Sequence, residues 1–118
     1  MRGNQMSKKW IIEPFILMTA GDMSGNLITK STNVKRLDNF GIQLVWSGTP
    51  VGTFDIQASV DGKNYVSLDF SSPVAASGSS GSHLINLNQI PYAWVRVAYT
   101  KNSGSGSLDI TIMGKDLN

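Results

Sequence analysis

Residues 52–60, Gly-Thr-Phe-Asp-Ile-Gln-Ala-Ser-Val, decide the fold class of this chain. Their apolar side chains, Phe54, Ile56, Ala58 and Val60, occupy every second position, and polar residues fill the positions between them. Successive side chains of a β-strand point to opposite faces of a sheet. The alternation therefore predicts a strand with one face in a protein core and the other in water.

The same period of two recurs elsewhere in the chain. Apolar and polar residues alternate within residues 42–47, 93–99 and 108–112, and residues 65–70 and 84–87 carry shorter patterns of this kind. No stretch combines a helix start signal, an apolar stripe with helical spacing and a stop signal. The sequence therefore predicts an all-β protein.

Turn-forming residues separate these stretches. Residues 47–52 and 102–106 are short, Gly-containing links that we interpret as hairpin connections, and Asp61-Gly62 is a pair that supplies positive φ in a tight hairpin turn. The Ser- and Gly-rich residues 71–82 are expected to form a surface loop, whose role the sequence does not define. Short strands joined by such turns favour an antiparallel β-sandwich or jelly roll of about eight strands.

The chain of 118 residues is long enough for one domain, which we place at residues 21–118 after an extended N-terminal arm at residues 1–20. Six basic and two acidic groups lie in residues 1–36, against four and six in the remainder. A basic and apolar arm is suited to binding a partner. The residues expected to contact that partner are Lys8, Lys9, Trp10, Ile11, Ile12 and Phe15.

Residues for catalysis or metal binding are scarce. His83 is the single histidine and there is no cysteine, so neither a catalytic triad nor a zinc site has support in the sequence. Asp61, Asn64 and Asp69 could give oxygen ligands to calcium, although a turn explains the first two. We therefore expect no enzymatic activity, no catalytic residues, no metal and no cofactor.

Net charge and hydropathy limit the possible partners further. A formal net charge of +2 gives no support for nucleic-acid binding. No apolar run approaches the ~20 residues that would span a membrane. We therefore expect neither nucleic acid nor membrane among the partners.

The aromatic side chains could fill a small core or form a platform for a sugar ring. Trp46 and Trp94 lie within clear strand patterns, which favours the core for both. Tyr65 and Tyr92 lie nearer to predicted loops and are the candidate aromatics for facing a glycan ligand. Arg96, alone between apolar strand residues, is expected to pair with an Asp or to extend along a sheet edge.

A resemblance covers about residues 15–115 and rests on several short stretches. These are residues 32–34, 37–39, 41–43, 46–50, 52–59, 85–89, 94–97, 99–100, 103–108 and 114–115. In these stretches the chain resembles a group of small β-sandwich proteins common in tailed-phage and marine viral genomes, regarded as virion components. The resemblance implies a structural protein located in the virion and defines no functional residue. A looser resemblance to discoidin-like carbohydrate-binding modules rests on residues 54–65 and 94–97, although the chain is shorter and lacks their paired cysteines.

The expectation that follows is a non-enzymatic capsid decoration or cement protein that binds and bridges major capsid subunits. We expect a homo-oligomer, with a trimer as the working assumption. The alternatives are a tail, baseplate or fibre-associated virion module, and a carbohydrate-binding module.

Overall fold

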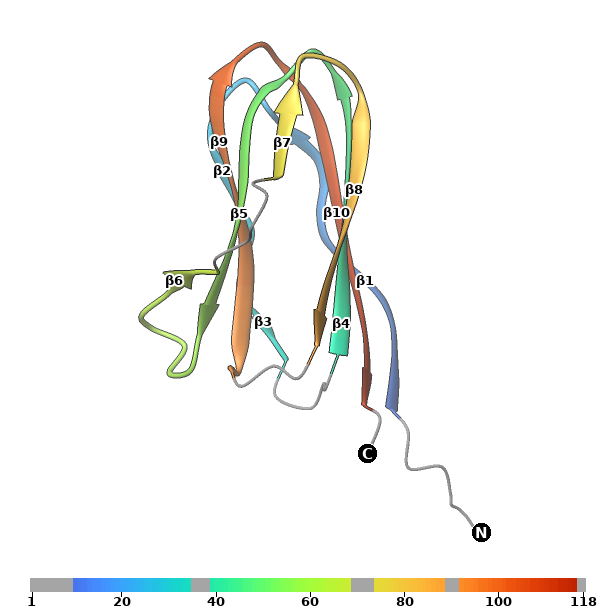
Figure 1. Cartoon of the computed structure of the whole chain (residues 1–118), viewed down its shortest axis with the longest axis vertical. Helices are drawn as coiled ribbons and strands as arrows, with labels where there is room; N and C mark the ends of the chain where they lie inside the picture. Colours follow the sequence, from blue (N-terminus) through green and yellow to red (C-terminus); the bar gives the residue numbers. More distant parts are fainter. Residues whose placement is uncertain (1–9, 35–38, 69–73, 89–91, 117–118) are drawn as a thin grey trace, which may run out of the picture.

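The stretch around Phe54 forms a central strand in one of two facing antiparallel sheets (Figure 1). The computed structural model describes residues 10–34, 39–68, 74–88 and 92–116. The strands within these residues are β1 (Trp10–Asp22), β2 (Leu27–Ile28), β3 (Thr32–Asn33), β4 (Asn39–Gly48), β5 (Val51–Ser59), β6 (Val66–Ser67), β7 (Val74–Ser77), β8 (Gly81–Asn88), β9 (Trp94–Ser103) and β10 (Gly106–Asp116).

One sheet has four strands in the order β1-β10-β4-β8. The other has the order β2-β9-β5-β6, with β3 also paired to β9 and β7 also paired to β5. Every pairing is antiparallel. The predicted all-β sandwich is confirmed. The described residues contain ten strands rather than about eight, because two-residue strands such as β2 and β3 carry no alternating pattern.

The core lies between the two sheets and is built from the predicted alternation. Ile42, Leu44 and Trp46 of β4 face Phe54 and Ile56 of β5, and all five are buried. Val95, Val97, Tyr99, Leu108, Ile110 and Ile112 complete the inner faces of β9 and β10. None of the described residues forms a helix long and apolar enough to cross a membrane.

The expected strand over residues 52–60 ends one residue early. β5 ends at Ser59, and Val60 is exposed in the turn that follows, instead of lying in the core with Phe54. Gly62 has φ 75°, as expected for its pair with Asp61. The connection spans residues 60–65, however, and is not a two-residue hairpin turn.

Two links that the sequence suggested as hairpins instead cross from one sheet to the other. β4 lies between β10 and β8, whereas β5 belongs to the other sheet, so residues 47–52 form an arch. The link at residues 102–106 likewise joins β9 of one sheet to β10 of the other. Each flanking strand has a complete set of partners within its own sheet, and the apolar faces meet across the core.

The Ser- and Gly-rich residues 71–82 are not a single loop. Val74–Ser77 form β7, which pairs with β5, and β8 begins at Gly81 and pairs with β4. The turn between β7 and β8 therefore also crosses from one sheet to the other, and it lies beside the links at residues 47–52 and 102–106 at the upper end of Figure 1. The Thr49 amide donates to the Ser105 carbonyl at 2.8 Å, and the Gly78 amide donates to the Pro50 carbonyl at 2.7 Å. These bonds connect the crossings to one another.

The N-terminal stretch is part of the sandwich from Trp10 onward. β1 pairs with β10 from Trp10 opposite Asp116 to Asp22 opposite Ser107. Leu17 is buried in the core, so the boundary proposed at residue 20 between arm and body falls inside a strand.

Candidate functional site

The outer face of the six-stranded sheet carries a connected group of polar side chains, here called the polar face: Ser31, Asp55, Gln57, Tyr65, Ser67 and Arg96. The Arg96 Nε donates to the Gln57 Oε1 at 2.7 Å, and the Gln57 Nε2 donates to the Asp55 Oδ2 at 3.0 Å. The Ser67 hydroxyl donates to the same Asp55 oxygen at 2.7 Å. The expected Asp partner of Arg96 is therefore a Gln, which itself contacts an Asp.

Tyr65 belongs to this polar face. The Arg96 guanidinium carbon lies 4.0 Å from the centroid of the Tyr65 ring, and the Tyr65 hydroxyl hydrogen-bonds the Ser31 hydroxyl. A guanidinium over an aromatic face is attracted by the ring's quadrupole. One face of the candidate glycan platform is thus covered by the protein's own cation.

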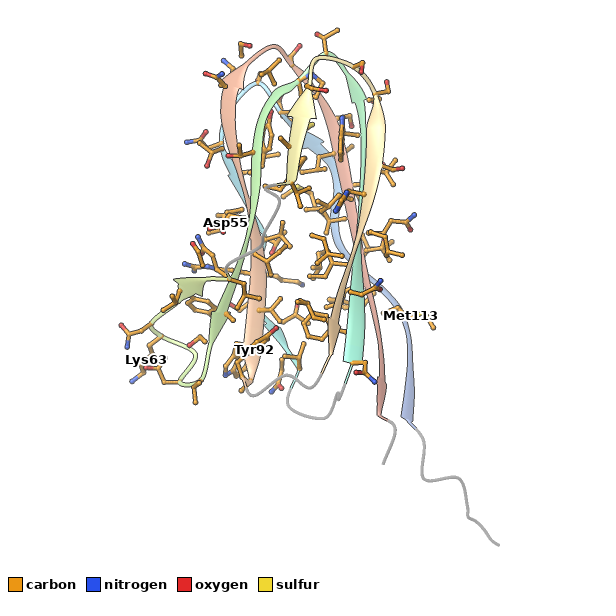
Figure 2. The ribbon with its side chains drawn as sticks, viewed as in Figure 1. Asp55, Lys63, Tyr92 and Met113 are labelled. Atoms are coloured by element: carbon orange, nitrogen blue, oxygen red, sulfur yellow. The ribbon has the colours of Figure 1, made fainter. Side chains whose placement is uncertain are left out.

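Tyr92 lies elsewhere, partly buried against the core (Figure 2). Its ring packs edge-on against Phe40, with the centroids 6.5 Å apart and the planes at 81°. Burial raises the pKa of the Tyr92 hydroxyl. Because Tyr65 contacts the polar face and Tyr92 contacts the core, the two candidate tyrosines do not form one platform.

The turn after β5 uses the Asp61 carboxylate for its own structure. The carboxylate accepts hydrogen bonds from the amides of Lys63 and Asn64, from the Asn64 side-chain amide and from the Ser59 hydroxyl, each at 2.8 Å. The two backbone amides are the main reason that the Asp61 pKa lies well below its usual range. Asp69, the third calcium candidate, is outside the described residues, within which no group of three or more His, Cys, Asp and Glu residues gathers.

The predicted partner-binding residues divide into three groups. Lys8 and Lys9 lie outside the described residues. Trp10, Ile11 and Ile12 pair, respectively, with Asp116, Lys115 and Gly114 of β10. Phe15 is exposed, with the Lys30 Nζ 5.7 Å from its ring centroid. From Trp10 onward, the stretch therefore extends the protein's own sheet.

The outer face of the four-stranded sheet exposes four large apolar side chains. Ile16 is 61% exposed, Leu84 60%, Val45 41% and Met113 40%. We call this surface of β1, β10, β4 and β8 the docking face. Met113 points away from the interior in Figure 2.

Strand pairing places these side chains on one face of the four-stranded sheet. Ile16 lies opposite Thr111, Thr111 opposite Gln43, and Gln43 opposite Leu84, so one row crosses all four strands. Adjacent strands lie about 4.7–4.9 Å apart, so Ile16 and Leu84 stand about 14 Å apart at the two ends of this row, with Thr111 and Gln43 between them.

Charged and polar side chains also lie on this face. Among the described outward positions, Asp109 of β10 accepts the Ala20 amide at 2.8 Å, and Asp22 of β1, opposite Ser107, accepts the Ser24 amide at 3.0 Å. Val45 lies opposite Asp109, and Met113 lies four residues after Asp109 on β10. A partner that covers this face would have to give hydrogen bonds to these carboxylates and to the polar side chains of Gln43, Asn86 and Thr111.

Sequence reasoning missed the docking face, although part of its signal was present. Val45 is in phase with Gln43, and Met113 is in phase with Asp109 and Thr111, so each is an apolar residue on the polar side of its strand. Ile16 and Leu84 join them only through long-range pairing, which no local pattern reveals.

The fold has known counterparts. The SPBc2 prophage-derived protein YomS superposes with a TM-score of 0.64 and 10% identity, covering 92% of this chain and 97% of that one. A pilus protein of Bacillus endospore appendages gives 0.47 at 15% identity over 92% and 90% of the two chains. The CBM1 module of BiXyn10A gives 0.46 at 8% identity over 74% and 61%. No protein family and no curated protein matches the sequence. The YomS superposition shows a shared sandwich fold.

Proposed function

We propose that this protein is a non-enzymatic structural component of a phage virion, a decoration or cement protein that binds and bridges major capsid subunits through its docking face. The observation that carries the proposal is the set of four exposed apolar side chains, Ile16, Val45, Leu84 and Met113, on the outer face of the four-stranded sheet. Large exposed apolar patches mark sites where proteins associate.

The fold comparison adds a weaker argument. YomS comes from a prophage and has the same sandwich over nearly its whole length. One fold serves many functions, so this likeness agrees with a phage role but does not specify which part of the phage the protein belongs to.

The arrangement of the charged side chains supports a non-enzymatic role. Asp55 and Arg96 are engaged in the polar face, and Asp61 is engaged in its turn. The Arg96 contact joins β9 to β5, and the Asp61 contacts hold a turn, so these charges have structural uses.

Copy number in purified virions tests this assignment. Quantitative mass spectrometry would compare this chain with the major capsid protein. Hundreds of copies in a fixed ratio to the major capsid protein would support a decoration or cement protein. A few copies per particle would indicate a component of a tail, baseplate or fibre instead. Absence from the particle would refute a virion role.

A binding experiment tests the docking face itself. Particles lacking this protein would be mixed with the wild type or with Ile16→Lys and Met113→Lys, which place charges on the face far from β8. Val66→Lys is the matched control, since Val66 is 70% exposed on β6 of the other sheet. We expect the first two variants to lose binding and the control to retain it. Equal binding by all of them would refute docking through this face.

A further inference from the structure

The two sheets have edges of very different character. A sheet edge offers unpaired backbone groups to other strands, and natural proteins protect such edges with short strands, charges, proline or bulges. β1 has three register shifts against β10, Pro14 within it and a positive φ of 51° at Ala20. The edge that β1 forms is therefore irregular.

The six-stranded sheet is protected in another way. Its outermost strands are β2, β3 and β6, with two residues each, and β7 with four. Strands this short offer few backbone groups to an incoming strand.

β8 has none of these protections. It forms the other edge of the four-stranded sheet and pairs with β4 over eight residues without a register shift. Gly81–Asn88 contains no proline and no formally charged residue when His83 is neutral. Within the described part of the chain, no backbone hydrogen bond joins β8 to anything beyond β4. Its outward amides and carbonyls form a regular row.

We propose that β8 pairs antiparallel with β8 of a second copy of this chain, giving a two-fold dimer with one continuous eight-stranded sheet. Half of the residues of a strand direct their backbone groups to each side, so two such edges form up to about eight main-chain hydrogen bonds. A two-fold axis makes the same surface serve on both copies. The uncharged strand meets no like charge when it pairs with itself.

The side chains of β8 agree with self-pairing. Ser82, Leu84 and Asn86 point to the docking face, whereas Ile85 points into the core. A two-fold axis perpendicular to the sheet keeps outward residues beside outward residues, because residues directly opposite in an antiparallel pair share a face. Leu84 of each copy then lies near the shared edge, where it is covered further.

The dimer has a consequence for the docking face. Because the axis is perpendicular to the sheet, the docking faces of the two copies lie side by side and point in the same direction. A dimer with two docking faces binds a repeating surface more tightly than a monomer with one, because once the first face is bound the second binds within the same complex. The pairing of β8 does not depend on the proposed virion function and replaces the trimer assumed from sequence.

Sedimentation equilibrium of the purified chain tests the dimer. Concentrations from about 1 μM to about 500 μM cover the range in which weak interfaces dissociate. We expect the mass to rise from one chain to two, and we expect Leu84→Lys or Asn86→Lys to raise the dissociation constant at least about tenfold, because edge lysines oppose strand pairing. Val66→Lys is again the control and should leave the constant unchanged.

Hydrogen exchange locates the interface. Amides of residues 81–88 should become more protected as the wild type associates, whereas amides of β1 should not change. A monomer at every concentration would overturn the proposal. So would a dimer that is equally stable in both β8 variants, or added protection at β1 instead of β8. Leu84 and Asn86 are exposed, and thermal melts verify that the variants remain folded.

Discussion

The crossing arches depend on Gly104, and replacing it with alanine tests this directly. Gly104 joins β9 to β10 with φ 75°. An added Cβ would collide with the Thr49 carbonyl oxygen and lie 2.9 Å from the Thr49 carbonyl carbon and 3.3 Å from the Pro50 Cα. These neighbours are backbone atoms, so no side-chain rotation relieves the collision.

The expected loss of stability follows from three contributions. Left-handed backbone costs an L-residue with a Cβ roughly 1–2 kcal/mol. Separating the arches breaks the hydrogen bond from the Thr49 amide to the Ser105 carbonyl, worth about 1 kcal/mol. Replacing glycine reduces the entropy of the unfolded chain and returns about 0.4–1 kcal/mol. The free energy of unfolding should therefore fall by about 1–3 kcal/mol.

Urea unfolding followed by tryptophan fluorescence measures this change. With a slope of about 1–3 kcal/mol per molar urea, the midpoint should fall by about 1 M. Gly25→Ala is the control, because Gly25 lies outside the left-handed region and its added Cβ meets nothing within 4 Å. Equal midpoints for Gly104→Ala and Gly25→Ala would refute the argument that the arches are tightly packed.

Three further predictions concern other parts of the sandwich. Deleting residues 1–19 should lower the thermal melt, because it removes most of β1 and the buried Leu17, whose burial is worth about 1.5–3 kcal/mol. A melt equal to that of the full chain would contradict the role of β1. Tyr65→Ala should lower the free energy of unfolding by about 1–2 kcal/mol, through loss of its cation–π contact and hydroxyl hydrogen bond, as measured by urea unfolding. The Asp61 pKa is lower in the folded than in the unfolded state, so its stabilisation is present at neutral pH and is lost as pH falls below about 4. Asp61→Asn should therefore be less stable than the wild type at neutral pH and lose less stability on acidification, and parallel pH profiles would contradict this.

Much of the fold could be predicted from local sequence. Ile42 and Leu44, or Val95 and Val97, alternate with polar neighbours, and burial follows this alternation. Because successive side chains of a strand point to opposite faces, the local pattern alone predicts which face of the sheet each of these residues occupies. Val60 is an exception because the turn begins before it.

Strand partners could not be predicted in the same way. The residues of the link at 47–52 fit a hairpin as well as an arch. The pairing of β4 with β10 and β8 depends on all strands of the chain and not on this link alone. The partner of the N-terminal stretch could not be predicted either. Its basic and apolar residues suggested an arm that binds another protein, whereas in the structure it pairs with β10 of the same chain.

The sequence by itself determined that this protein is a β-sandwich and which residues of its alternating strands fill the core, because alternation acts between near neighbours. Only the tertiary structure decided which strands lie side by side, which face is left apolar and which edge is left regular. The docking face combines Ile16, Val45, Leu84 and Met113 from four strands. Such a surface exists only once residues far apart in the chain have been paired, because hydrogen bonding between strands is a long-range choice.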